Sequence, residues 1–202
     1  MHEAELLHFI RSRRSVRRFQ SREVQSDVLE EILNTALSAP SAHNRQPWRF
    51  AVVQSAPRKA RLAELMGLEF RRDLQKDGLA PAEIDTRLAR SWERVLQAPA
   101  LIVLCLDPAD LDHYPDLTRN QAEQLMAVQS VAMAGSTLML AAHACGLGSV
   151  WICAPLFTPQ AVLLALDLPA TWQPQGMLLT GYPDYLPPTR PRHPLAEVTR
   201  YY

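Results

Sequence analysis

Hydrophobic residues in this chain recur at helical spacing over several long segments, with polar residues on the opposite faces. Val28, Leu29 and Ile32 fall on one side of a helix predicted over residues 26–39, with Ser26 as a plausible N-cap. Pro40 ends that helix because its ring blocks the helical hydrogen bond. The same spacing predicts further helices over residues 3–12, 57–66, 81–96, 119–145 and 159–166.

Short apolar runs predict strands over residues 48–54, 100–106, 149–153 and 176–182. The run over residues 100–106 is apolar at every position, which is typical of a strand covered on both faces. Residues 70–78 are too polar to assign, and five prolines in residues 183–202 predict a coil that wraps a surface rather than a helix. The pattern predicts a single α+β domain over residues 1–202, with a modest sheet between many helices.

Composition excludes several classes of protein. Lys and Arg number 21 against 21 Asp and Glu, and the short basic run over residues 11–18 does not indicate nucleic-acid binding. Three widely spaced cysteines form neither a disulfide framework nor a metal site, which fits a reducing compartment. Residues 125–145 are largely apolar but include Ser130 and His143, so they predict a buried helix rather than a membrane span. We therefore expect a cytoplasmic protein.

The first candidate binding segment is extended and contains four polar residues: Arg13, Arg14, Ser15 and Arg17. In an extended backbone, residues 13, 15 and 17 share one side. Arginine forks and a serine hydroxyl match the charge and the acceptor oxygens of a phosphate. The alternative is a solvated basic patch between two elements. Arg190 and Arg192 in the tail could close on the same anion.

A second candidate is the segment that joins a helix to a strand over residues 39–48, with the sequence APSAHNRQPW. Asn44 and Gln46 offer amide donors and acceptors in a frame stiffened by Pro47, which suits the polar edge of a heteroaromatic ring. The alternative is a turn with local side-chain bonding. Trp48 is interpreted as a core residue, and the pattern assigns no role to His43 or Arg45.

The third feature is the strand and loop over residues 149–155, whose backbone N–H groups could face a ligand. Cys153 is interpreted as a buried, inert thiol because no activating histidine is placed beside it. Gly146-x-Gly148 is no dinucleotide fingerprint, since it follows a helix and lacks the third glycine. The sequence contains no metal-ligand motif, so no metal is predicted.

Together these motifs resemble those of the FMN-dependent nitroreductase family. Its members begin with Arg-Arg/His-Ser-x-Arg/Lys, which corresponds here to residues 13–17. They continue with Ala-Pro-Ser-x-x-Asn-x-Gln-Pro-Trp, here residues 39–48, and close with phosphate contacts in a tail rich in Pro and Arg, here Arg190 and Arg192. Three motifs in the right order, spanning residues 11–198, are more specific than any one of them.

The resemblance implies a nitroreductase-like α+β fold, in which a mainly antiparallel central sheet is flanked by helices. It also implies an intertwined homodimer that holds FMN between its subunits. Arg13, Arg14 and Ser15 would hold the phosphate and ribityl chain, and Arg17 would lie near the N1/O2 edge of the ring. The implied cofactor-binding residues are Arg13, Arg14, Ser15, Arg17, Pro40, Ser41, Asn44, Gln46, Ile152, Cys153, Ala154, Arg190 and Arg192.

The implied activity is ping-pong hydride transfer from NAD(P)H or a similar donor to an organic acceptor. Acceptors of the expected kind are a nitroaromatic, a quinone or an unsaturated precursor of a deazaflavin coenzyme. The flavin does this chemistry, so no side chain is required as an acid or a base. Residues 77–90 and 111–119 are expected to cover the substrate side of the flavin.

A closer likeness involves the middle of the chain, including Asp77-Gly78-Leu79, Tyr114-Pro115-Asp116 and residues 146–152. These segments resemble the reductase domain fused to the γ-glutamyl ligase of deazaflavin coenzyme synthesis, which is understood to saturate a dehydro precursor with reduced FMN. No ligase domain is expected within these 202 residues, and Asn44-x-Gln46-Pro47-Trp48 resembles general nitroreductases instead. The alternative function is a non-catalytic flavin-binding protein or a partner subunit in that pathway.

Overall fold

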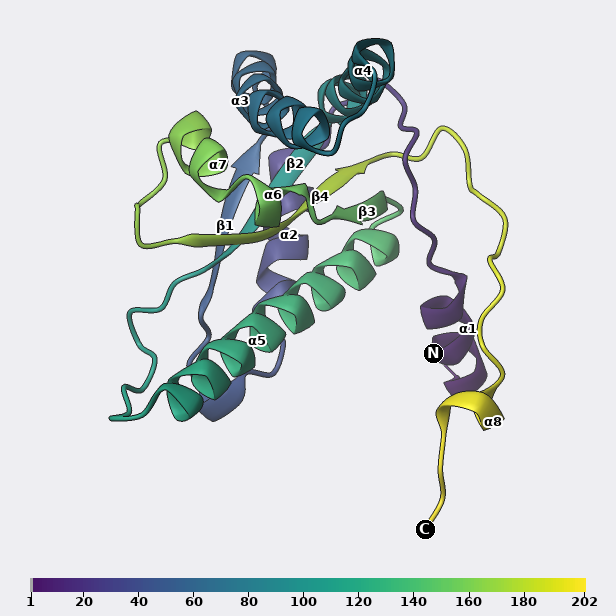
Figure 1. The fold of residues 1–202 in the computed structure, drawn as a ribbon. Helices are drawn as coiled ribbons and strands as arrows, with labels where there is room; N and C mark the ends of the chain where they lie inside the picture. Colours follow the sequence, from purple (N-terminus) through teal and green to yellow (C-terminus); the bar gives the residue numbers. More distant parts are fainter. Residues whose placement is uncertain (1) are drawn as a thin grey trace.

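The computed structural model describes residues 2–202 and contains a four-stranded sheet with helices on both sides (Figure 1). The strands are β1 (Trp48–Val53), β2 (Ala100–Leu106), β3 (Gly148–Ile152) and β4 (Gln173–Gly181). The helices are α1 (Glu3–Ser12), α2 (Ser26–Ala36), the 3-10 turn η1 (Ala42–Asn44), α3 (Ala56–Lys76), α4 (Pro81–Gln97), α5 (Leu117–Ala144), α6 (Ala154–Phe157), α7 (Pro159–Leu166) and α8 (Leu195–Val198).

The strand order is β1-β2-β4-β3, and every neighbouring pair is antiparallel. Strand β2 occupies the interior of the sheet, where Leu104 faces Phe50 of β1 and Ile102 faces Leu178 of β4. All seven residues of β2 are buried, which confirms the prediction of a strand covered on both faces. The fold is therefore α+β with an antiparallel sheet, as predicted.

Alternate residues of β2 enter two separate hydrophobic cores, because successive side chains of a strand point to opposite faces. Ile102 and Leu104 pack with residues of α2 and α5 on one face. Leu101 and Val103 pack with residues of α3 and α7 on the other face. Figure 1 shows these layers, with α3, α4 and α7 on one side of the sheet and α5 on the other.

The packing of α5 against the sheet depends on a slot for the indole of Trp151. A Cβ atom at Gly135 of α5 would lie 2.3 Å from Cζ3 of Trp151, and one at Gly176 of β4 would lie 2.2 Å from its Cζ2. Both distances are far below van der Waals contact, so only glycine fits at these two positions. The slot belongs to the core of the fold.

Helix α5 is long and apolar enough to span a membrane, but 44% of its most apolar window is buried inside the protein.

Helix α1 and the C-terminal tail lie apart from the layered body, at one side of it (Figure 1). None of the ten residues of α1 is buried, and Leu6, Leu7 and Ile10 are all exposed. The tail is irregular coil over most of its length, as predicted, but the short helix α8 interrupts it after Pro194. These peripheral segments expose apolar side chains that the single chain does not cover.

Several predicted boundaries were wrong. Helix α3 continues to Lys76 through residues 70–76, which appeared too polar, because Leu74 reaches the core while the other side chains stay in solvent. Helix α6 was not predicted at all. Gln25, not Ser26, is the N-cap of α2.

Candidate functional site

Six arginines line one cavity of about 660 Å³ between the N-terminal segment and the C-terminal tail, and none of its lining residues is acidic. The tail contributes Pro187, Pro188 and Thr189 as well, and Ser15 completes the polar lining. The arginines are Arg11, Arg13, Arg14, Arg17, Arg190 and Arg192. The structure therefore brings the two predicted phosphate-binding segments, which are far apart in the sequence, to a single cavity, and it adds Arg11 to them.

Arg13 gives the clearest indication that this cavity suits an anion. Its Nη1 atom is buried and has no hydrogen-bond partner in the part of the chain that the structure describes. Burial and the nearby cations of Arg192 and Arg14 lower the pKa of Arg13. Uncompensated positive charge of this kind is costly unless an anion binds there. The donors present fit a phosphate, which accepts several charge-assisted hydrogen bonds.

The arginine segment is fixed to the edge of the sheet by backbone bonds. Ser15 forms a parallel bridge with Ser149 of β3, and Val16 N donates to Ser149 O at 3.0 Å. Further along, Gln20 N donates to Tyr182 O at 2.9 Å. The segment is extended, as predicted, so Ser15 and the arginines are held beside the start of β3.

His143 near the C-terminal end of α5 connects α1 to this region. Its Nε2 lies 2.8 Å from Ser12 Oγ, and its ring stacks on Phe9 with centroids 4.8 Å apart. Burial, and next the charges of Arg13 and Arg14, lower the pKa of His143, against a hydrogen bond to the backbone carbonyl of Phe9 that raises it. The imidazole is therefore biased towards its neutral form, beside an uncompensated group of cations.

The loop containing Pro40, Ser41, Asn44 and Gln46 has an unusual backbone. His43, Asn44 and Gln46 have φ values of 52°, 53° and 51°, in the left-handed region that non-glycine residues rarely adopt. Ser41 stabilises this conformation, because its carbonyl accepts from Asn44 N at 3.0 Å and its Oγ accepts from Gln46 N at 3.1 Å. The amide groups of Asn44 and Gln46 remain exposed on this rigid turn.

Arg45, to which the sequence assigned no role, anchors the loop to the rest of the protein. Its Nη1 donates to Asp110 O at 2.9 Å, and its guanidinium pairs with Asp112. Its Nε lies 3.7 Å from the buried Glu123 carboxylate of α5. No short motif reveals this network, because its members are separated by more than sixty positions of the chain.

The loop packs against the middle and the N-terminal half of α5, whereas the arginine cavity lies beside the C-terminal end of that helix. Ala42 N donates to Ser130 Oγ at 3.3 Å, whereas Ser12 contacts His143 close to the end of the helix. Since α-helices rise 1.5 Å per residue, these anchor points are roughly 20 Å apart along the axis. Within one chain, the loop residues therefore do not join the arginines in one site.

Ile152 and Ala154 line a further cavity of about 520 Å³, which is also bordered by α3 and α4. Between them, Cys153 is the N-cap of α6 and is exposed. The interpretation of Cys153 as a buried thiol was wrong, because β3 ends at Ile152 and the chain turns outward there. The expected substrate-side residues Asp77, Arg87 and Arg90 line the same cavity. Of the other expected segment, residues 111–119, Asp112 lies instead beside Arg45.

The sequence reading missed Arg94, which borders this cavity together with Arg90. The available signal was their spacing of four residues on the polar face of a predicted helix, which places both on one side. That spacing is common on solvated helices, so it indicates a site only when a cavity is known to lie beside it.

Comparisons with known proteins identify related chains. A model of the nitroreductase family matches residues 10–182. A 5,6-dimethylbenzimidazole synthase of Rhodospirillum rubrum is 34% identical, over 93% of this chain and 83% of its own length. A candidate NADH dehydrogenase/NAD(P)H nitroreductase of Methanothermobacter thermautotrophicus is 28% identical, over 92% of this chain and 81% of its own. The structure of a candidate nitroreductase from Desulfovibrio desulfuricans, in complex with FMN, has a TM-score of 0.75 at 26% identity and covers 100% of this chain and 98% of that one.

Proposed function

The chain belongs to the nitroreductase family, and on that premise we propose that it is an FMN-dependent oxidoreductase. It would transfer hydride from NAD(P)H or a similar donor to an organic acceptor by a ping-pong mechanism. The observation that carries this proposal is the cavity lined by six arginines, in which the buried Nη1 of Arg13 has no partner among the described residues. A phosphate group would supply the missing acceptor.

In this proposal Arg13, Arg14 and Ser15 hold the FMN phosphate from the N-terminal segment, and Arg190 and Arg192 close over it from the tail. All five residues border the same cavity. Charge-assisted hydrogen bonds from several guanidinium groups favour phosphate over neutral ligands. The contacts of Ser15 and Val16 with β3 fix the cavity relative to the sheet, so that a bound phosphate would orient the remainder of the cofactor.

The rest of the site requires a second copy of the chain. The loop with Ser41 and Asn44 lies well away from the arginines along α5, so the loop of one copy would meet the arginine cavity of the other. Leu125 and Met133 on α5 are 57% and 38% exposed, which leaves an apolar strip on the outer face of this helix. Exposed apolar strips of this kind mark subunit interfaces. A homodimer would cover this face and the exposed side chains of α1.

When bound, FMN would supply the hydride chemistry, accepting hydride from the donor and passing it to the acceptor. The chain would supply position, charge and exclusion of water. Arg17 borders the arginine cavity and would place a cation where negative charge develops on the reduced ring, and a preorganised charge of this kind favours reduction. Ile152 and Ala154 would cover the ring from the end of β3. No side chain is assigned as an acid or a base.

The acceptor in this proposal is a nitroaromatic, a quinone or an unsaturated deazaflavin-coenzyme precursor. Anaerobic mixing of purified, FMN-loaded protein with NADH and with NADPH tests the proposal directly. Bleaching of the flavin absorbance, followed by its return when an acceptor is added, is the expected result. A yellow protein that neither donor reduces would instead indicate a flavin-binding or partner subunit without turnover.

The phosphate site is tested separately with Arg14→Glu, which places a carboxylate beside the proposed phosphate position. FMN retention on desalting should be lost, while the circular dichroism spectrum stays unchanged. Arg72→Glu on α3 is the matched control, since Arg72 is exposed and does not border the arginine cavity. If the Arg14 variant retains FMN as the wild type does, the phosphate site is placed wrongly.

A further inference from the structure

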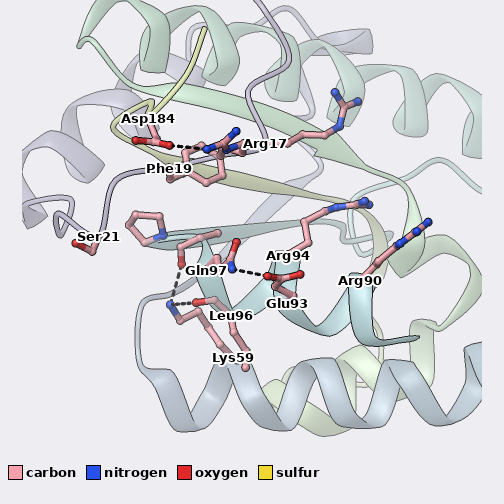
Figure 2. A pocket seen from close by; sticks show the side chains of 13 residues that line it. Arg17, Phe19, Ser21, Lys59, Arg90, Glu93, Arg94, Leu96, Gln97 and Asp184 are labelled. Carbon is pink, nitrogen blue, oxygen red and sulfur yellow. Dashed lines mark hydrogen bonds and ion pairs between the residues drawn. The ribbon is translucent and has the colours of Figure 1, made fainter. Parts of the chain in front are cut away.

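Two arginines of α4 point into open space beside the proposed flavin site. Arg90 and Arg94 are four residues apart, so they lie on the same side of the helix. Figure 2 shows that their guanidinium groups extend to the same side as that of Arg17. Within residues 2–202 neither Arg90 nor Arg94 forms an ion pair or a side-chain hydrogen bond, whereas Arg87 on the same helix pairs with Glu83.

These two arginines connect the cavities around the proposed site. Arg17 borders both the arginine cavity and a neighbouring cavity of about 850 Å³. Arg90 and Arg94 border that neighbouring cavity and also the 520 Å³ cavity that contains Ile152 and Ala154. The pair therefore lies between Arg17 and the end of β3, the two places assigned to the flavin ring.

The acidic side chains nearby are mostly engaged elsewhere. Glu93 accepts from Gln97 Nε2 at 2.8 Å, and Asp184 pairs with Arg18 at 3.2 Å (Figure 2). On the α3 side of the smaller cavity, Asp73 pairs with Lys76 at 3.4 Å. Asp77 also borders this cavity, from the C-terminal end of α3. Among the described residues none of these carboxylates pairs with Arg90 or Arg94, so both guanidinium groups are available to a ligand.

The remainder of the smaller cavity is apolar. Met66, Phe70 and Leu74 line it from α3, and Ile152 and Phe157 line it from the other side. The side chain of Phe157 is 75% exposed, which is unusual for a large aromatic residue. An apolar wall with a few polar groups at its border is typical of sites for small organic molecules.

We propose that Arg90 and Arg94 bind the anionic group, a phosphate or a carboxylate, of a substrate whose flat apolar part occupies the cavity beside Ile152. This inference rests on the proposed function, because the substrate would be the hydride donor or the acceptor of that reaction. It would make the enzyme selective for substrates that carry an anionic group, which FMN binding alone does not do. Arginine suits this role because its planar fork pairs with carboxylate and phosphate groups.

The test compares two probes that differ in charge but little in shape, 4-nitrobenzoate and 4-nitrobenzamide. The enzyme is the FMN-loaded wild type and its Arg90→Gln/Arg94→Gln variant. We expect the variant to lose about tenfold in kcat/KM for 4-nitrobenzoate and less than about twofold for the amide. Tenfold corresponds to about 1.4 kcal/mol in total, shared between two exposed guanidinium groups.

Calorimetric titration of 4-nitrobenzoate gives a second measurement that does not depend on turnover. Its affinity should fall in the double variant and should weaken with added salt in the wild type. Titration of the apo-protein separates the two proposals. If the wild type retains no FMN, the proposed function fails, while binding of 4-nitrobenzoate to the apo-protein still reports on the arginines. Arg72→Gln, which removes one exposed arginine of α3, is the control.

The anionic group could belong to the donor instead of the acceptor, and reduction by NADPH and NADH distinguishes the two. If the double variant loses only a preference for NADPH, the arginines bind the additional phosphate of that donor. If it loses only the preference for 4-nitrobenzoate, they bind the acceptor. The proposal is overturned if the double variant has the kcat/KM values of the wild type for both acceptors and both donors. It is also overturned if Arg72→Gln has the same effect as the double variant.

Discussion

The carboxylate of Glu123 lies 3.7 Å from Nε of Arg45 and joins the core helix α5 to the loop that carries Ser41 and Asn44. The Glu123 side chain is 3% exposed, and that of Arg45 is 28% exposed. Arg45 Nε and Glu123 Oε2 are both buried without a hydrogen-bond partner among the described residues. The ion pair therefore compensates two groups that would be costly to bury singly.

Glu123→Gln should destabilise the protein by about 1–3 kcal/mol, because it leaves the half-buried Arg45 without its buried counter-charge. Urea denaturation followed by circular dichroism measures this free energy of unfolding. Glu83→Gln is the control, since Glu83 pairs with Arg87 on the exposed face of α4 and its removal should cost less than about 0.5 kcal/mol. Equal effects of the two changes would mean that the buried pair contributes no more than a surface pair.

Gly176→Ala should destabilise the protein by about 1–3 kcal/mol, because the new methyl group would lie 2.2 Å from Cζ2 of Trp151. Urea denaturation gives the free energy of unfolding, and near-ultraviolet circular dichroism reports movement of the indole. The control is Gly67→Ala in α3, whose Cβ would be 3.9 Å from Leu88. That change should stabilise the helix by up to about 1 kcal/mol. An unaffected Gly176 variant would show that Trp151 can leave its slot without cost.

Arg13→Gln should weaken binding of FMN about 10- to 100-fold and leave binding of riboflavin within about threefold of wild type. The reason is that a charge-assisted hydrogen bond to phosphate contributes about 1.5–3 kcal/mol, and riboflavin has no phosphate. Fluorescence titration of both flavins measures the two affinities. A parallel loss of both would place Arg13 against the ring system instead of the phosphate.

The pKa of His143 is lowered in the folded protein, mainly by burial and then by Arg13 and Arg14. Below the ordinary pKa of 6.5, the unfolded chain therefore binds more protons at this position, and stability falls as the pH decreases. We expect His143→Gln to lose less stability than the wild type between about pH 7 and pH 5.5, as measured by urea denaturation. The exposed His8→Gln is the control.

Titration of the His143 imidazole also tests whether an anion binds beside Arg13 and Arg14. Since nearby cations lower the pKa of His143, binding of FMN or inorganic phosphate to these cations should raise it. A titration of the His143 resonance by nuclear magnetic resonance, with and without phosphate, measures the change. An unchanged titration curve would argue that no anion binds beside Arg13.

The three cysteines should react with Ellman's reagent at different rates near pH 8, because the thiolate is the reactive form. Cys153 is exposed and should react first. Burial raises the pKa of Cys105 to about 12, so that thiol should react only on unfolding. Burial and the Glu31 carboxylate raise the pKa of the half-buried Cys145, which should be intermediate. Cys153→Ser should remove the fast phase, and saturating FMN should slow it in the wild type.

The elements that bury a regular apolar pattern could be predicted from the sequence. The continuous run of β2 and the apolar stretch of α5 both appear as expected, since burial on both faces or along a core helix leaves a direct trace in composition. The second half of α3 could not be predicted in this way. It buries Leu74 but few other side chains, so its periodicity is weak.

The candidate site was predictable only as separate segments. The residues around Arg13 and the tail around Arg190 each carry a local signal, but their meeting at one cavity depends on how the tail returns past β3. No local pattern in the sequence predicts the ion pair of Arg45 with Glu123. Contacts between residues distant in the sequence are decided by packing, which no short pattern encodes.

The separation of Ser41 and Arg13 along α5 has a consequence for how the protein must be handled. In the proposed dimer, FMN held between two copies would be retained only while the copies stay associated, so its occupancy would depend on the total protein concentration as well as on the concentration of FMN. Dilution alone would then release flavin and lower the specific activity, because the concentration of dimer varies with the square of the concentration of free protomer. Assays at nanomolar and micromolar protein would differ for this reason and not because the chemistry had changed.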